Sequence, residues 1–186
     1  MRFGKRLLGG LSRLNAVLRR KSTAIAGSAV FFVLAPGVVA GLLPWLLTHW
    51  HRLPLSPYLA SRLAGMMLIV AGLAFLIHAF VRFALEGAGT PAPVAPTERL
   101  VVGGIYRHVR NPMYVAVLAI IAGQALLFQQ SSLILYASIV GVAMFAFVRL
   151  YEEPLLAHRY GAAYAAYRSA VPGWLPRLTP WHGNGK

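Results

Sequence analysis

Long apolar stretches alternate with short polar or basic segments along this chain of 186 residues. Residues 24–47 contain no charged side chain, and residues 63–81 form a second apolar run that only His78 interrupts. A helix needs about 20 residues to cross a hydrocarbon layer of about 30 Å. The pattern therefore predicts two membrane-spanning helices in the first half of the chain.

The second half contains a longer charge-free stretch, between Arg110 and Arg149. As one straight helix this stretch would be about 57 Å long, nearly twice the thickness of a bilayer core. Two glutamines and two serines, residues 129–132, lie near its middle. The pattern predicts a hairpin of two helices over residues 113–128 and 133–148, which makes four spans.

After Arg149 the pattern changes to that of an amphipathic helix, which the sequence Val171-Pro172-Gly173 would end. We therefore expect an all-α integral membrane protein with four transmembrane helices, a C-terminal helical hairpin and a cytosolic amphipathic helix. Residues 23–186 would form one membrane domain, preceded by a basic amphipathic segment over residues 1–22.

Composition supports the membrane interpretation. Hydrophobic residues make up 58% of the chain and charged residues 12%, about half the charged fraction of a soluble domain, which excludes a water-soluble monomer. The chain has no Cys, which excludes disulfides and thiol nucleophiles. We expect no metal site.

The charge is strongly positive, because 18 Lys and Arg face four Glu and no Asp, for a net charge of +14. Such a charge suits nucleic acid or the cytosolic flanks of a membrane protein, and the apolar content favours membrane lipids and no nucleic acid. Nearly all Lys and Arg lie in the N-terminal segment, the 82–110 loop and the tail after residue 148. By the positive-inside rule, both termini would be cytosolic.

Two segments could carry chemistry. The first is residues 103–114, where a structural interpretation makes Asn111 a helix N-cap, Pro112 the first helical residue and Tyr114 an interfacial aromatic residue. In the functional interpretation, a Tyr, two Arg and the helix N-terminus bind a small anionic or amphoteric ligand at the membrane surface. The residues alone leave both interpretations open.

The second segment, Arg149-Leu150-Tyr151-Glu152-Glu153-Pro154, follows the fourth predicted span. It could form a surface ion pair, because Arg149 reaches Glu152 at i+3 or Glu153 at i+4. Alternatively, the paired carboxylates, which are half of all acids in the chain, could hold a cationic ligand at the lipid boundary.

Taken in order across the charge-free hairpin, the two segments resemble the C-terminal signature of integral-membrane methyltransferases, the isoprenylcysteine carboxyl methyltransferase and phospholipid N-methyltransferase group. The resemblance covers about residues 100–177. It rests on two motifs: Tyr106-Arg107-x-x-Arg110-Asn111-Pro112-x-Tyr114, and Glu152-Glu153-x-x-Leu156-x-x-x-Tyr160-Gly161-x-x-Tyr164-x-x-Tyr167-x-x-x-Val171-Pro172.

The resemblance implies an S-adenosylmethionine site on the cytosolic side and methyl transfer to a lipophilic acceptor from the bilayer. Glu152 or Glu153 would act at the catalytic centre and hold the positive parts of the cofactor. Arg107 or Arg110 would hold its carboxylate, and tyrosines its adenine. The implied cofactor-binding residues are Tyr106, Arg107, Arg110, Asn111, Pro112, Tyr114, Arg149 and Tyr164.

The chain departs from the family pattern at two positions. Asn111 stands where the family commonly has His, and Tyr160 where it has Phe; Asn cannot titrate, so a proton-removing role there is not expected. Bacterial members share this Arg-Asn-Pro variant, which suggests the bacterial inner membrane. The acceptor could be a lipid amine, a carboxylate or a thiol. The alternative functions are a small four-span carrier and a non-catalytic lipid-binding protein.

Overall fold

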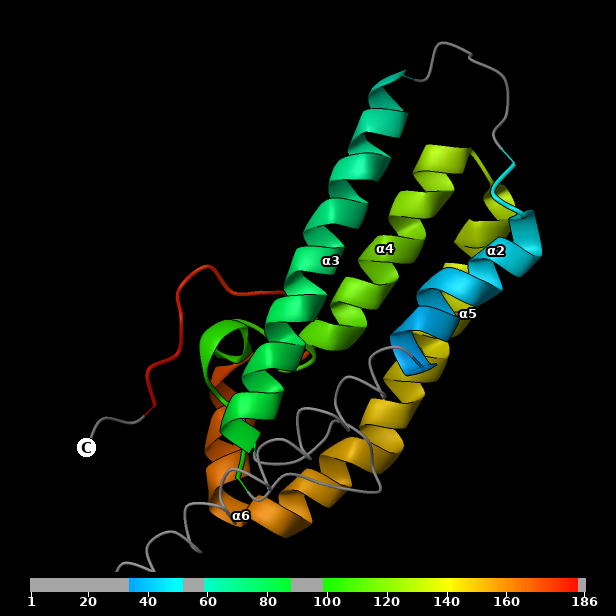
Figure 1. Ribbon diagram of the computed structural model, residues 1–186. Helices are drawn as coiled ribbons and strands as arrows, with labels where there is room; N and C mark the ends of the chain where they lie inside the picture. Colours follow the sequence, from blue (N-terminus) through cyan, green and yellow to red (C-terminus); the bar gives the residue numbers. More distant parts are fainter. Residues whose placement is uncertain (1–33, 52–58, 88–98, 184–186) are drawn as a thin grey trace, which may run out of the picture.

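The computed structural model describes residues 34–51, 59–87 and 99–183, and all regular elements within them are helices. The helices form an elongated bundle whose last helix turns back at one end (Figure 1). The all-α expectation is confirmed for these residues. The predicted basic segment 1–22 and the start of the first predicted span lie outside the described residues, as do parts of both polar loops.

The first described helix contains a π-helical turn, η1 (Val38–Leu42), followed by α2 (Leu43–Thr48). Pro44 has no N–H, so carbonyl groups of the preceding turn lose a helical donor. Side chains of other helices replace it: the Tyr136 hydroxyl donates to the Val39 carbonyl oxygen at 2.8 Å, and the Gln124 amide to that of Ala40 at 2.6 Å. Every carbonyl freed in an apolar medium needs such a donor, so these bonds fix the helix to the bundle.

Helices α3 (Leu59–Gly87) and α4 (Pro112–Phe128) pack most closely. A Cβ atom added to Gly65 would lie only 2.6 Å from the Gly123 carbonyl oxygen, so neither position has room for a side chain. Gly72 lies in similar contact with Ile120. Small residues that let two backbones approach are typical of helix pairs in membranes.

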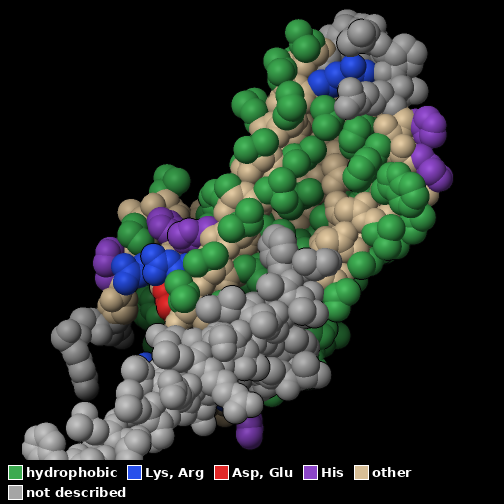
Figure 2. All heavy atoms as spheres, viewed as in Figure 1, with side chains coloured by type: hydrophobic (Ala, Val, Ile, Leu, Met, Phe, Trp, Pro, Cys, Tyr) green, Lys and Arg blue, Asp and Glu red, His purple; other side chains and the backbone are tan. Residues whose placement is uncertain are grey.

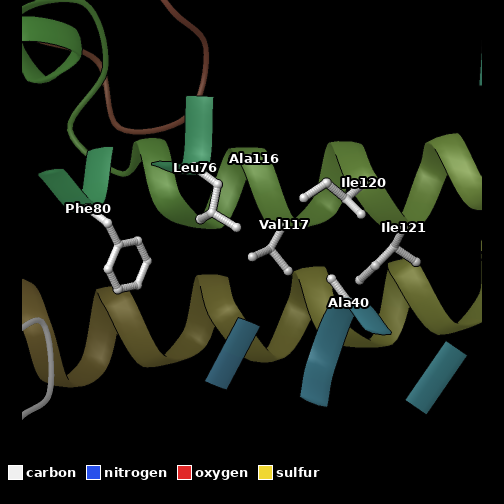
Figure 3. Packing of buried hydrophobic residues seen from close by; sticks show 7 residues of the cluster. All are labelled: Ala40, Leu76, Phe80, Ala116, Val117, Ile120 and Ile121. Atoms are coloured by element: carbon white, nitrogen blue, oxygen red, sulfur yellow. The ribbon is translucent and has the colours of Figure 1, made fainter. Parts of the chain in front are cut away.

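Toward the middle of the bundle, a buried apolar cluster joins α3, α4 and the first helix (Figure 3). It consists of Ala40, Leu76, Phe80, Ala116, Val117, Ile120 and Ile121.

The hairpin turns at Gln129 and Gln130, between α4 and α5 (Ser131–Phe147). The helix then continues without interruption through a π-helical turn, η3 (Val148–Glu152), into α6 (Glu153–Ala170). Gly161, with φ 51° and ψ −126°, changes its direction. The predicted amphipathic helix is therefore the direct extension of the fourth predicted span, and its bend lies eight residues after Glu153 rather than at the span's end.

Two helices, Leu59–Glu86 and Ser131–Ala170, are long and apolar enough to cross a membrane, and Leu34–Thr48 and Pro112–Phe128 are shorter apolar helices. The apolar part of the longer helix ends near Val148, where Arg149, Glu152 and Glu153 follow. Figure 2 shows hydrophobic side chains along the bundle, with charged side chains away from its middle. This surface suits a lipid environment. The number of four spans remains a prediction.

Candidate functional site

A cavity of about 240 Å³ lies where the loop before α4 meets α3, α6 and the first helix. It extends from the charged residues after α5 into the apolar bundle. Its lining includes seven of the ten site residues expected from the sequence: Tyr106, Arg110, Asn111, Pro112, Tyr114, Glu152 and Tyr164.

The end of α3 holds the loop on one side of the cavity. The Glu86 carboxylate accepts a hydrogen bond of 3.0 Å from the Gly103 N–H. It also forms an ion pair of 3.1 Å with Arg82. Gly104 has φ 55°, and a Cβ atom there would lie 2.8 Å from the Arg82 Nε, so this turn requires glycine. A short 3₁₀ helix, η2 (Gly104–Arg107), then directs Tyr106 inward.

Tyr106 is buried in the cavity wall beside Phe83, with ring centroids 6.4 Å apart. The Tyr167 hydroxyl donates a hydrogen bond of 2.7 Å to the Tyr106 carbonyl oxygen, which ties the loop to α6. Burial raises the pKa of Tyr106 well above its ordinary value. This phenol therefore stays neutral and can donate a hydrogen bond.

Asn111 and Pro112 occupy the N-cap and the start of α4 as predicted, but the Asn111 side chain makes no capping hydrogen bond. Its Nδ2 atom is buried and has no hydrogen-bond partner within the described structure. A buried donor left unpaired costs about 1–3 kcal/mol. Since Asn111 lines the cavity, an acceptor group of a ligand could satisfy this donor.

Arg110 connects the cavity to α6 and to the chain after it. Its Nε donates to the Val171 carbonyl oxygen at 2.9 Å. Its Nη1 donates to the Glu153 carboxylate at 2.9 Å and to the Tyr164 hydroxyl at 3.0 Å. The side chain is 12% exposed, so these bonds hold its guanidinium in place at the cavity wall.

Glu153 is buried among three arginines. Its carboxylate lies 2.9 Å from Arg110, 2.7 Å from Arg149 and 3.2 Å from Arg168. Burial alone would raise the pKa of Glu153, but hydrogen bonds from Arg149 and Arg110 and the charges of Arg110 and Arg168 lower it overall. Glu153 therefore stays ionised and joins α6 to the loop before α4.

Glu152 lies in a different environment from its neighbour. It lines the cavity, and within the described residues none of the ion pairs includes it. Burial and the nearby charge of Glu153 raise the pKa of Glu152, whereas hydrogen bonding with Tyr114 lowers it. Glu152 is therefore a carboxylate that a cationic ligand could stabilise.

Aromatic side chains make up much of the remaining wall. Tyr160, Tyr164 and Tyr167 come from α6, Tyr151 from η3, and Phe80 and Phe83 from α3. Among the described residues, the cavity therefore combines one carboxylate that forms no ion pair, one amide donor without a hydrogen-bond partner, and many ring faces.

The model of the family described as phospholipid methyltransferase matches residues 60–163, which is more than half of the chain. The chain belongs to this family. Comparison with curated proteins gave no match, and comparison with solved structures gave none. The family establishes the chain as a methyltransferase in general terms, which argues against a carrier or a lipid-binding scaffold, and points to lipid-like substrates and a membrane location.

The cavity of this methyltransferase does not include three of the predicted site residues. Arg107 is exposed, and Arg149 and Glu153 form the ion pair beside the cavity rather than part of its lining. Of the two carboxylates, Glu152 lines the cavity and Glu153 does not; which of them faces a ligand stays a prediction. The ion pair of Arg149 is with Glu153 at i+4, which was one of its two predicted partners.

Several lining residues of the methyltransferase were missing from the predicted site. Tyr160 and Tyr167 belong to the second motif but were not among the expected cofactor-binding residues, and their i, i+4, i+7 spacing with Tyr164 was the signal available. Phe80 and Met144 lie in apolar runs where nothing distinguishes them from residues that face lipid, and Phe83 follows the second run, between Arg82 and Glu86. Pro36 and Val39 join them only because the first helix packs beside the cavity.

Proposed function

We propose that this protein transfers a methyl group from S-adenosylmethionine to a lipophilic acceptor at the cytosolic face of a bacterial inner membrane. The observation that carries the proposal is Glu152, a partly buried carboxylate without an ion-pair partner among the described residues, in a cavity otherwise lined mainly by apolar and aromatic side chains. The pattern of Lys and Arg along the chain supports the cytosolic face.

The residues present fit the cofactor. Glu152 would face its positive groups, and the tyrosine rings would support them by cation–π contacts. The Asn111 Nδ2 donor and the Arg110 guanidinium would receive its carboxylate. When bound, S-adenosylmethionine supplies an activated methyl group on a sulfonium.

The protein's own contribution is orientation and exclusion of water. The bonds of Arg110 to Val171, Glu153 and Tyr164 fix one side of the site before any ligand arrives. Such preorganisation favours an in-line approach of the acceptor and lowers the entropic part of the barrier. Asn111 cannot remove a proton, so it would act only as a hydrogen-bonding group.

The acceptor would enter from the apolar end of the cavity. Pro36 and Val39 of the first helix, Phe80 of α3, Val117 of α4 and Met144 of α5 line that end and offer no charge. A hydrocarbon chain fits this surface, whereas a charged soluble acceptor would lose its hydration without compensation. Lipid amines, carboxylates and thiols with an apolar tail are all compatible with it.

Calorimetry with S-adenosylhomocysteine in detergent tests the proposal. We expect Glu152→Gln to weaken binding at least about tenfold, because one charge-assisted contact contributes about 1.5–3 kcal/mol. His158→Gln is the matched control, since it places the same glutamine at an exposed position of α6 that does not line the cavity, and its affinity should stay within about threefold of wild type. Unchanged affinity in Glu152→Gln, or no binding by the wild type, would overturn the assigned site.

A further inference from the structure

The chain beyond the family match forms a strap across the site. Residues 171–181, called here the C-terminal strap, follow α6 and lie against residues 107–111. Four backbone hydrogen bonds join the two segments at 2.9 to 3.2 Å. They run from the Arg110, Asn111, Arg177 and Trp181 N–H groups to the carbonyl oxygens of Pro172, Gly173, His108 and Arg107 respectively.

The strap brings one aromatic side chain to the outside of the cavity wall. The Trp174 ring lies 6.2 Å from the Tyr114 ring and 5.8 Å from the Phe145 ring, measured between centroids, at angles of 32° and 35°. Trp174 itself does not line the cavity, but Tyr114 does. Trp174 therefore contacts the site through Tyr114, a residue that belongs to it.

Tyr114 connects this contact to the carboxylate. Tyr114 and Glu152, the residue on which the proposed function depends, line the same cavity, and the neighbouring Tyr114 hydroxyl lowers the pKa of that carboxyl. A tyrosine ring in a wide cavity can rotate about two side-chain bonds, and a second ring packed against its outer face restricts that rotation. Phe145 of α5 also lies against Trp174, so the Trp174 ring contacts both helices of the hairpin.

We propose that Trp174 is a positioning residue for methyl transfer, which holds the Tyr114 hydroxyl against Glu152 so that the carboxylate faces the bound cofactor. This inference rests on the proposed function. It assigns a role to the C-terminal strap, which lies beyond the family match that ends at residue 163. The strap would then be part of the site rather than only an anchor for the loop.

The backbone bonds of the strap allow the two roles to be separated. They use main-chain atoms, so a substitution of the Trp174 side chain leaves them in place. Trp174→Leu removes the ring contacts, whereas Trp174→Phe keeps a ring. Leu178→Ala is a control on the same strap, because the Leu178 side chain is exposed and lines no cavity.

The test is a double-mutant cycle on S-adenosylhomocysteine affinity, measured by calorimetry on the full chain in detergent. We expect Trp174→Leu to weaken binding about fivefold, Trp174→Phe to restore it to within about twofold, and Leu178→Ala to have no effect. In a Tyr114→Phe background, Trp174→Leu should cause no further loss, because the hydroxyl that it positions is already absent. If Trp174→Leu does not fold, Trp174→Met takes its place in the cycle.

Two results would overturn the inference while leaving the proposed function intact: wild-type affinity in Trp174→Leu, or an equal loss in both backgrounds. The second result would mean that Trp174 acts on the fold and not through Tyr114. No binding of S-adenosylhomocysteine by the wild type would overturn both proposals together, so the failures can be told apart.

Discussion

The side-chain amide of Gln124 donates a hydrogen bond of 2.6 Å to the backbone carbonyl oxygen of Ala40, between two helices that are 84 residues apart in the chain. Both residues are buried. The bond replaces a donor that the helix before Pro44 lacks, so a polar residue in an otherwise apolar helix has a structural reason. It also fixes the first helix beside the cavity that Val39 lines.

We expect Gln124→Leu to destabilise the protein by about 1–2 kcal/mol, because it leaves a buried carbonyl without a donor. For a chain of this size the melting temperature in detergent should fall by about 3–6 °C. Gln130→Leu is the matched control: the Gln130 amide also bonds a backbone carbonyl, that of His51, but at an exposed position. Equal losses in both variants would contradict the importance of the Ala40 bond.

The sequence predicted the order of the helices and the hairpin, but not the local geometry within the helices. The charge-free stretch after Arg110 and the polar residues at 129–132 predicted the hairpin, because apolar length and turn polarity are local properties. The π-helical turns at Val38–Leu42 and Val148–Glu152 were not predicted. The first of them receives side-chain donors from other helices, which hydrophobic periodicity does not encode.

The close contact of α3 and α4 predicts opposite effects for two glycine substitutions. Gly65→Ala places a Cβ atom 2.6 Å from the Gly123 carbonyl oxygen, so the helices must separate and the melting temperature should fall. Gly41→Ala meets no atom within 4 Å and should be neutral or stabilising by up to about 1 kcal/mol. Thermal unfolding of both variants in the same detergent checks this, and a similar fall in both would be inconsistent with it.

The arginine cluster predicts a dependence on pH. The folded-state pKa of Glu153 lies below its ordinary value, so its ionisation stabilises the fold above the unfolded-state pKa, which is about 4.3. This contribution is lost as the pH falls through the lowered value. Thermal melts should show wild type losing stability below about pH 4.5 more steeply than Glu153→Gln. Parallel pH profiles would mean that the cluster does not hold the fold together.

The neighbouring carboxylate should behave in the opposite way. The folded-state pKa of Glu152 lies above its ordinary value, so its ionisation destabilises the fold as the pH rises from the unfolded-state value through the folded one. At pH 7 we therefore expect Glu152→Gln to melt at or above the wild-type temperature, whereas Glu153→Gln melts below it. A fall in Glu152→Gln as large as that in Glu153→Gln would show that both carboxylates support the fold.

The orientation of the chain can be tested by labelling. Single cysteines at Ser12, Ser56, Thr97 and Thr179 start from a chain without Cys, so each reports one position. The distribution of Lys and Arg predicts that only position 56 reacts with an impermeant reagent added from outside the cell. External labelling at position 97 would overturn the topology and the cytosolic site. Permeabilised cells give the control, in which all four positions should react.

The sequence motifs predicted which segments contribute to the candidate site, but not the different environments of their individual side chains. The adjacent carboxylates Glu152 and Glu153 look equivalent in the sequence. In the structure Glu152 lines the cavity, whereas Glu153 forms ion pairs with three arginines. Arg168, one helical turn after Tyr164 of the second motif, is the third arginine of that cluster. The bend at Gly161 and the position of α6 determine that it pairs with Glu153 and not with Glu152. Such choices depend on tertiary packing, which spacing alone does not reveal.

The continuous helix from Ser131 to the bend at Gly161 has a consequence for the lipid around the protein. A spanning helix adapts to the thickness of its bilayer by tilting. Because the backbone continues from α5 through η3 without a bend before Gly161, such a tilt carries Glu152 with it and changes the depth of the cavity mouth among the lipid headgroups. Acyl-chain length in the host membrane would thus regulate how well an anchored acceptor reaches the site.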